Sequence, residues 1–388
     1  MNKIKEICKR PQVWGFFVSI AVMALLSLAF FYPDNFAGNS LRQPDMLQGA
    51  ANSQESKLFE EATGEKALWT DALFGGMPTF QISPSYPSNS LFNWINRVYG
   101  LGLPVPSNLL FMMMLGFLIL LYALRMRWYY ALIGAVAWGF SSYFIIIIGA
   151  GHIWKFVALS YIPPTIAGFI LLYRGRYVAG AALLSLFAMM QLNANHPQMS
   201  YYFVLVMAIL AICYLIEAIR RHTVRRWAIA SAVALVAGGL ALGANAPSLY
   251  NTYKYAKETK RAQSELTPLE QASGNNSTAE RPTGGLPKSD IVGWSYGPSE
   301  LFTLVVPNVK GGASARPEGG QMAALSLGKL NAAAAYSDAP LVQYLSQYFN
   351  DSEGTNGPVY PGVIMFALFL TGCFIVRSPL KWAMVSSS

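Results

Sequence analysis

An aspartate stands directly after the first long apolar segment of the chain. In the stretch NSLRQPDMLQGA, residues 39–50, Asp45 follows Pro44 at the predicted start of a helix. Proline suits that position because its fixed backbone angle matches a helix and its missing N–H would have no partner there. Free N–H groups and the helix dipole favour a carboxylate at a helix start. Asp45 is therefore a candidate general base, and a helix cap is the alternative interpretation.

Cations, imidazoles and an amide occur at the ends of three apolar segments. Such groups bind phosphate oxygens, as a point charge or as charge-assisted hydrogen-bond donors. Each also has an ordinary interpretation, because a His at the end of a membrane span commonly bonds to lipid or backbone, and a Lys reaches toward the headgroups. The candidates for substrate binding are Arg42 in NSLRQPDMLQGA, His152 and Lys155 in GAGHIWK, and His196 and Gln198 in NANHPQMSYY.

Three further candidates lie in stretches rich in aromatic residues. Trp69 and Asp71 in LWTDALFGGMP could contact a substrate, although an interfacial anchor and a helix cap are the more ordinary roles. The pair Gly75 and Gly76 in the same stretch predicts a tight backbone turn. Glu300 in WSYGPSE is expected to be exposed, and its aromatic neighbours are what mark it as a candidate binding residue.

The elements that must position these residues are mostly apolar helices. Of the 388 residues, 54% are hydrophobic and only 12% are charged, which is typical of a polytopic membrane protein rather than a soluble domain. Apolar runs long enough to cross a bilayer predict about eight transmembrane helices, near 13–33, 107–124, 128–148, 154–173, 177–194, 199–216, 228–246 and 359–376. The predicted fold class is therefore an all-α polytopic membrane protein.

Basic residues fill every second connection between these spans. The segment before the first span and those after the second, fourth, sixth and eighth hold 14 of the 28 Lys and Arg residues. By the positive-inside rule these segments face the cytoplasm, so both termini are predicted to be cytoplasmic. The same distribution explains the net charge of +9 without nucleic acid as a partner. The predicted partner of the apolar surface is the lipid bilayer.

This topology divides the chain into five parts and puts two large loops on the outer side. The parts are the N-terminus with the first span (1–33), the first outward loop (34–106), spans two to seven (107–246), the second outward loop (247–358), and the eighth span with the cytoplasmic end (359–388). In the first loop, the pattern predicts one helix from Met46 to Ala62 that stops at Gly64. Pro163 and Pro164 predict an interruption of the fourth span.

Five segments, spread from residue 43 to about 308, together resemble the Bacteroidetes branch of the YfhO-like family of bacterial membrane proteins. They are QPDMLQGA, TGEKALWTDALFGGMPTFQIS, FSSYFIIIIGAGHIWK, NANHPQMSYY and WSYGPSELFTLVVPN. That family is similar to the GT-C superfamily of polytopic glycosyltransferases, in which an essential acid follows the first span and the donor is usually a polyprenyl-phosphate sugar. The resemblance implies that Asp45 is this acid. Because the sequence is Gln-Pro-Asp rather than a paired acid, no motif supports a divalent metal cofactor, and that requirement stays open.

The residues and the resemblance lead to one main hypothesis and two alternatives. The main hypothesis is a membrane glycosyltransferase in the bacterial cytoplasmic (inner) membrane. It would transfer a sugar from a polyprenyl-phosphate-linked donor to a cell-envelope acceptor on the outer face, with Asp45 as base. The alternatives are a transporter or flippase of lipid-linked sugar, built on discontinuous helices, and a non-catalytic membrane assembly protein in which Asp45 only caps a helix. The sequence names neither the sugar nor the acceptor.

Overall fold

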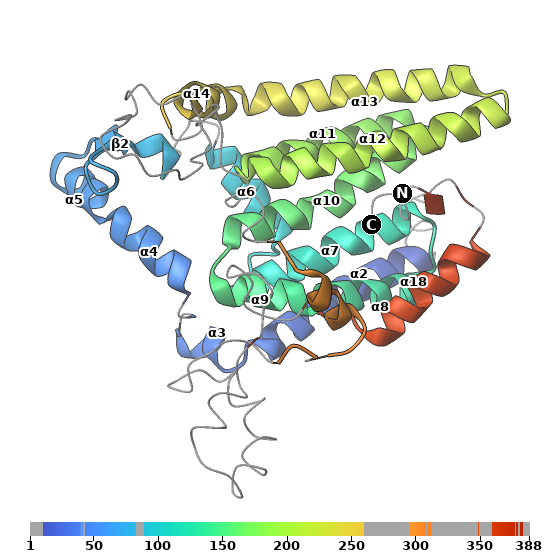
Figure 1. Cartoon of the computed structure of the whole chain (residues 1–388), viewed down its shortest axis with the longest axis horizontal. Helices are drawn as coiled ribbons and strands as arrows, with labels where there is room; N and C mark the ends of the chain where they lie inside the picture. The colour runs from blue at the N-terminus through green and yellow to red at the C-terminus, as the bar shows by residue number, and fades with distance from the viewer. Residues whose placement is uncertain are drawn as a thin grey trace, which may run out of the picture. The chain divides into compact units, whose positions relative to one another are not determined.

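The structure of the chain, a computed structural model, is built mainly from α-helices (Figure 1). The residues that it describes are 11–39, 41, 43–82, 89–259, 295–307, 309–311, 348, 359–376, 378 and 381–382. The chain divides into two compact units, one formed by Met1–Ala246 with Ala367–Ser388 and the other by Pro247–Phe366. Among the described candidate site residues, all except Glu300 belong to the first unit.

The elements follow one another along the chain as a series of helices with one small hairpin. The helices up to residue 244 are α2 (Pro11–Phe30), α3 (Asp34–Ala37), α4 (Pro44–Asn52), α5 (Gln54–Thr63), α6 (Asn89–Tyr99), α7 (Ser107–Ala123), α8 (Trp128–Gly139), α9 (Ser142–Ala150), α10 (Ile153–Tyr173), α11 (Tyr177–Asn193), α12 (Pro197–Arg220) and α13 (Val224–Ala244). They are followed by α14 (Ala246–Ala256), the 3-10 helix η2 (Pro298–Leu304) and α18 (Val363–Ile375). Between α5 and α6, β1 (Trp69–Thr70) pairs antiparallel with β2 (Met77–Pro78), and the 3-10 helix η1 (Thr79–Gln81) follows.

Four of the described helices are long and apolar enough to cross a membrane, namely α2, α10, α12 and α13. The pair α8 and α9 makes a fifth span if the two count as one, with a bend of 45° at the break. The helices α7, α11 and α18 coincide with predicted spans but are shorter. The 17 residues of α7 extend only about 25 Å, against a hydrocarbon core of about 30 Å. The fold is therefore helical, with four or five helices of membrane-spanning length.

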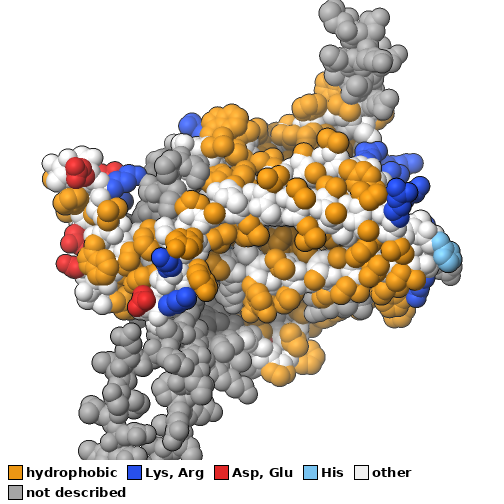
Figure 2. All heavy atoms as spheres, turned by 90° about the horizontal axis from the view of Figure 1, so that it is seen from above, with side chains coloured by type: hydrophobic (Ala, Val, Ile, Leu, Met, Phe, Trp, Pro, Cys, Tyr) orange, Lys and Arg blue, Asp and Glu red, His pale blue; other side chains and the backbone are white. Residues whose placement is uncertain are grey.

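The outer face of α13 carries large apolar side chains that remain exposed. Leu235 is 78% exposed and Leu240 is 65% exposed. Figure 2 shows hydrophobic side chains across this face of the molecule, with Lys and Arg gathered at the end where α12 and α13 are joined. Contiguous apolar surface of this kind is rare on soluble monomers. It is the surface that a helix facing lipid needs.

α10 is the central helix of the bundle, with α7 and α11 as its main neighbours. Small residues bring α10 and α11 close together. A Cβ atom on Gly168 would lie 2.5 Å from the backbone nitrogen of Leu184, and one on Gly180 would lie 2.8 Å from the carbonyl oxygen of Gly168. Only glycine fits such a crossing, as is common between membrane helices.

One cluster of buried hydrophobic side chains joins the ends of α9, α10 and α11. It contains aromatic and branched residues from all three helices, including Phe144, Ile147, Ile148, Phe156, Val157, Phe187 and Met190. Interiors packed in this way resist small displacements because each side chain fills the space left by its neighbours. The cluster therefore fixes the three helix ends relative to one another, and the loops at these ends carry the candidate site.

The prediction of one helix from Met46 to Ala62 is wrong. α4 ends at Asn52 and α5 begins at Gln54, with Ser53 between them at φ −96° and ψ 0°. The Ser53 hydroxyl donates a hydrogen bond to the Ala50 carbonyl oxygen at 3.2 Å. Such local side-chain bonds compete with the helix, which explains the break. The predicted stop is confirmed, since Gly64 has φ 75° and its N–H donates to Glu60.

The predicted interruption at Pro163 and Pro164 is also wrong, because α10 runs unbroken through both. The two prolines remove N–H donors from carbonyls one turn earlier, at Leu159 and Ser160. The Ser160 carbonyl oxygen accepts instead from the Tyr99 hydroxyl at 3.3 Å. A neighbouring helix thus replaces a lost bond, which is how membrane helices tolerate proline. The break lies in the preceding predicted span, between α8 and α9.

Candidate functional site

Asp45 lies in the first turn of α4, where the sequence pattern predicts it. Gln43 is the N-cap residue, with extended backbone angles of φ −110° and ψ 116°, and Pro44 begins the helix. The Asp45 side chain is 50% exposed. Asp45 is therefore held by the helix start and still open to a ligand.

Gly151 and His152 form the corner between α9 and α10. Gly151 ends α9 in the left-handed conformation, with φ 90°, and His152 is the N-cap residue of α10. α4 packs directly on this corner. A Cβ atom on Gly151 would lie 3.0 Å from Cβ of Gln43 and 3.4 Å from Cβ of Asp45. Glycine is thus required both for the turn and for the approach of α4.

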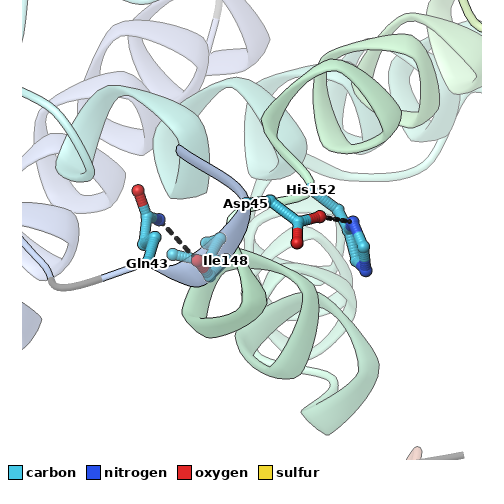
Figure 3. Close-up of polar contacts among 4 residues, drawn as sticks. All are labelled: Gln43, Asp45, Ile148 and His152. Atoms are coloured by element: carbon cyan, nitrogen blue, oxygen red, sulfur yellow. Dashed lines mark hydrogen bonds and ion pairs between the residues drawn. The ribbon is translucent and has the colours of Figure 1, made fainter. Parts of the chain in front are cut away.

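Gln43 fastens the start of α4 to this corner. Its side chain is buried, and Nε2 donates to the carbonyl oxygen of Ile148 at 2.5 Å (Figure 3). Carbonyls in the last turn of a helix lack the usual intrahelical partner. The Ile148 carbonyl accepts from the Gly151 N–H and from Gln43. The bond from Gln43 places the next turn, with Asp45, beside His152.

The carboxylate of Asp45 and the imidazole of His152 make the central contact of the site. Nδ1 of His152 lies 2.7 Å from Oδ2 of Asp45, and the two side chains are 46% and 50% exposed, respectively (Figure 3). An exposed ion pair adds little stability, so its main effect is orientation. Among the described residues, Oδ1 of Asp45 and Nε2 of His152 have no partner of their own and could bind a ligand. A paired carboxylate and imidazole can transfer a proton to or from a bound group.

Lys155 and His196 extend this region to the start of α12. Lys155 follows His152 by three residues, so both lie on one side of α10, and its Nζ is 5.4 Å from the centre of the Tyr143 ring. Burial lowers the pKa of His196 below its ordinary value of 6.5, and the charges of Lys155 and His152 lower it further. These interactions bring four side chains into one region. We call it the Asp45 site, formed by Asp45, His152, Lys155 and His196.

Trp69 and Asp71 bond to each other in the β1–β2 hairpin. The indole Nε1 of Trp69 donates to Oδ1 of Asp71 at 3.0 Å. Between them, the Thr70 hydroxyl donates to Glu55 at 2.9 Å and ties the hairpin to α5. The turn predicted at Gly75 and Gly76 forms the hairpin loop, and both have positive φ. Asp71 therefore has a structural partner, and it is not a helix cap.

The other candidate near this region that the structure describes, Gln198, does not join the Asp45 site. Gln198 is exposed in the first turn of α12. Residues two apart on a helix do not face each other, so Gln198 points away from His196. Arg42 lies outside the described residues.

Glu300 is buried, whereas the sequence predicts an exposed acid. Its side chain is 1% exposed, its Oε1 accepts from the Tyr348 hydroxyl at 2.9 Å, and its Oε2 accepts from the Gly297 N–H at 2.7 Å. A carboxylate can be buried when donors replace its water. Those donors come from the turn before η2 and from Tyr348, which local sequence does not reveal. Glu300 belongs to the second unit and is hydrogen-bonded within it.

Gln191 is a polar residue of this region that the sequence analysis did not select. It lies in the last turn of α11, is 2% exposed, and its Oε1 accepts from the Ser200 hydroxyl at 3.2 Å. The same hydroxyl lies 3.3 Å from the His196 carbonyl oxygen. The available signal is an amide inside the apolar stretch FAMMQLN, because polar residues inside membrane helices commonly face the bundle interior.

A divalent metal does not fit the residues around Asp45. Within the part of the chain that the structure describes, no three His, Cys, Asp or Glu side chains come together to hold a metal ion. The Asp45 site has a single carboxylate, and the charge of Lys155 opposes a second cation. We therefore derive no step through a metal.

A basic cavity of about 540 Å³ lies at the other end of α12. Its lining includes Arg220, Arg221 and Lys381, with Glu217 paired to Arg221. Because α12 has 24 residues, the cavity is roughly 35 Å from the Asp45 site. It is therefore separate from the carboxylate and imidazole chemistry.

Comparisons with known proteins add no assignment to this geometry. No protein-family model, no curated protein and no solved structure matches the chain. Function must be argued from the Asp45 site itself. That site has a carboxylate paired with an imidazole, a lysine and a second imidazole, each at the start of α4, α10 or α12.

Proposed function

We propose that the chain is a YfhO-like membrane glycosyltransferase of GT-C type. It would transfer a sugar from a polyprenyl-phosphate donor to a cell-envelope acceptor. The observation that supports this most is the 2.7 Å contact between Oδ2 of Asp45 and Nδ1 of His152. The contact gives the acid that follows the first long apolar helix a fixed partner. It also brings this acid to Lys155 and His196, which suit a phosphate and a sugar.

The proposed setting is the bacterial cytoplasmic membrane, with about eight crossings and both termini in the cytoplasm. This topology follows from the basic residues before α2 and after α7, α10 and α12, by the positive-inside rule. The Asp45 site lies at the opposite ends of these helices and would face outward. A lipid donor keeps its tail in the bilayer and its phosphate at the surface. A site at the outer helix ends meets that phosphate without moving the tail.

The proposed reaction uses three groups. Oδ1 of Asp45 takes the proton from the acceptor hydroxyl while the hydroxyl oxygen forms a bond to the anomeric carbon. The bond between that carbon and the phosphate oxygen breaks, and polyprenyl phosphate leaves with the electron pair. Lys155 stabilises the charge on the departing phosphate. His152 donates from Nδ1 to Oδ2 of Asp45 and holds the carboxylate in position.

A flippase of lipid-linked sugar is the second candidate. The 45° break between α8 and α9 favours it, because transporters commonly use discontinuous helices. Moving an intact donor breaks no covalent bond, so a flippase has no use for a positioned base. The Asp45–His152 pair therefore favours the transferase.

One assay separates these functions. Purified protein in vesicles is incubated with an undecaprenyl-phosphate sugar, and free undecaprenyl phosphate is measured. We expect release in the wild type and in the Asp34→Asn control, which changes a half-buried acid of the same loop, and none in Asp45→Asn. Movement of intact donor without release would identify a flippase. If the protein neither releases undecaprenyl phosphate nor moves the intact donor, the result would indicate an assembly protein in which Asp45 only caps α4.

A further inference from the structure

Two buried polar atoms beside the Asp45 site have no partner among the described residues. They are Nε2 of Gln191 and Nδ1 of His196. Buried donors and acceptors in proteins are nearly always hydrogen-bonded, because an unpaired one keeps the full cost of leaving water. Two such atoms, in residues that are linked through Ser200, therefore point to a partner other than the described residues.

The Gln191 amide is held by one hydrogen bond, and its nitrogen has no partner among the described residues. Its side chain is 2% exposed, and Ser200 lies 3.2 Å from Oε1. Because Oε1 faces the Ser200 hydroxyl, Nε2 is the atom left without an acceptor among the described residues. The amide therefore presents a hydrogen-bond donor at this position.

His196 supplies the second half of the pair. It begins α12 and is joined to Gln191 through Ser200, whose hydroxyl lies 3.3 Å from the His196 carbonyl oxygen. Burial, Lys155 and His152 lower the pKa of His196, so its imidazole is neutral near pH 7. In a neutral imidazole one ring nitrogen is an acceptor. Nδ1 can therefore accept a hydrogen bond while the Gln191 amide donates one.

One donor and one acceptor select the chemistry of the ligand. A hydroxyl group satisfies both, since its oxygen accepts from Nε2 of Gln191 and its proton is donated to Nδ1 of His196. A phosphate oxygen would face the lone pair of Nδ1, and an ammonium group would face the N–H of Gln191. Both would be repelled by one of the two partners. The pair fits a hydroxyl group and neither kind of ion.

We infer that Gln191 and His196 form a hydroxyl-binding subsite that holds one hydroxyl of the donor's sugar beside Asp45. The inference rests on the proposed function, which supplies a sugar at this place. Lys155 would then hold the phosphate, and the subsite would fix the ring so that its anomeric carbon faces the carboxylate. Gln191 is a binding residue in this scheme. A single buried water is the competing occupant, since water also donates and accepts.

The test compares lipids with and without the sugar, in the Asp45→Asn background so that the donor stays intact. Affinities are measured for undecaprenyl phosphate and for undecaprenyl phosphate carrying glucose, mannose or galactose. In Gln191→Leu, we expect the preference for the favoured sugar lipid to fall about tenfold, the effect of losing roughly one hydrogen bond. Affinity for undecaprenyl phosphate itself stays within about twofold.

Asn245 offers a matched control because it is similarly buried but its amide nitrogen makes two hydrogen bonds. Its Nδ2 donates to the carbonyl oxygens of Met189 and Ala241 at 3.0 and 2.9 Å. Without lipid, Asn245→Leu should lower Tm more than Gln191→Leu, since it removes two hydrogen bonds, whereas Gln191→Leu removes one bond together with an unsatisfied group. The sugar preference should survive in Asn245→Leu.

Three results would overturn the subsite. The first is an equal loss of affinity for the lipids with and without sugar in Gln191→Leu. The second is a fall in the Tm of Gln191→Leu as large as that of Asn245→Leu. The third is that the parent Asp45→Asn protein prefers none of the three sugars. The first two would assign the amide to structure or to a bound water. A different result would reject the proposed function, namely that wild-type protein releases no undecaprenyl phosphate from the sugar donor. A sugar preference without release would keep the subsite and reject the transferase.

Discussion

Nδ1 of His152 lies 2.7 Å from Oδ2 of Asp45, across the contact between α4 and the α9–α10 corner. The two residues come from distant parts of the chain, and packing rather than charge brings them together. Gln43 fastens the start of α4 to Ile148, and Gly151 leaves room for it. An ion pair this exposed would not hold the elements together by itself. The pair is thus positioned by its neighbours, so those neighbours can be tested separately from it.

Replacing His152 by Gln tests which residue of the pair takes the proton. A Gln amide can donate to Asp45 but cannot act as a base, so we expect kcat to fall about tenfold with KM little changed, against a loss of about 10²–10⁴ in Asp45→Asn. The kcat of His152→Ala should lie between those of His152→Gln and Asp45→Asn. Kinetics with an undecaprenyl-phosphate sugar measure this. If His152→Gln is as inactive as Asp45→Asn, Nε2 of the imidazole takes the proton and Asp45 only orients the ring.

Lys155 should act on the phosphate rather than on the sugar. Its ammonium is the one cation that we place in the Asp45 site, and it lies over the Tyr143 ring. We expect Lys155→Ala to weaken binding of undecaprenyl phosphate about tenfold and to reduce the salt dependence of that binding. Lys57→Ala, which changes an exposed lysine of α5, is the control and should bind as the wild type. Equal binding by both variants would remove Lys155 from the site.

Local rules predict the parts of the site that depend on short stretches of chain. The helix start at Asp45 follows from Pro44 and the acid in the first turn, and the end of α5 follows from Gly64. Continuous apolar runs of sufficient length predict the long helices α2, α10, α12 and α13. These features depend on backbone geometry and side-chain type within a few residues, so one sequence is sufficient to find them.

The rest depends on contacts between distant segments. The continuity of α10 through Pro163 and Pro164 relies partly on the Tyr99 hydroxyl, and the burial of Glu300 relies on Tyr348. Gln43 and Gln191 look like ordinary polar residues until the packing shows what they face. No periodicity encodes such pairings, because they come from how the helices assemble. The sequence therefore identifies Asp45, His152, Lys155 and His196 as candidates without showing their mutual arrangement.

Gly151→Ala should damage the site more than the same change at another helix end. Gly151 and Gly175 both end helices with positive φ, at 90° and 79°, so each substitution should cost about 1 kcal/mol or more of backbone strain. At Gly175 nothing lies within 4 Å of the new Cβ, whereas at Gly151 it would meet Gln43 and Asp45. We expect Tm to fall in both variants.

Only Gly151→Ala should also lose transfer activity, by about tenfold or more, because the new methyl group pushes α4 away from His152. Assays are run below the Tm of both variants, so that unfolding does not contribute. Equal activity in the two variants would show that the approach of α4 to Gly151 does not position Asp45.

His196 should make stability depend on pH in a defined interval. Burial, Lys155 and His152 lower its folded-state pKa below 6.5, so between these two pKa values the unfolded chain binds more protons than the folded one. Stability therefore rises with pH through that interval. The contribution is complete above about pH 6.5 and is lost as the pH falls toward the lowered pKa.

Thermal unfolding of wild type and His196→Asn at about pH 7.5 and about pH 5 measures the effect. The fall in Tm between the two pH values should be larger in wild type than in His196→Asn, because asparagine takes up no proton. His222→Asn changes an exposed histidine between α12 and α13 and should keep the wild-type difference. Lys155→Ala should reduce the difference in Tm between the two pH values, since removing this charge raises the pKa of His196 toward 6.5. An unchanged difference in both His196→Asn and Lys155→Ala would mean that His196 is not buried beside Lys155 in the folded protein.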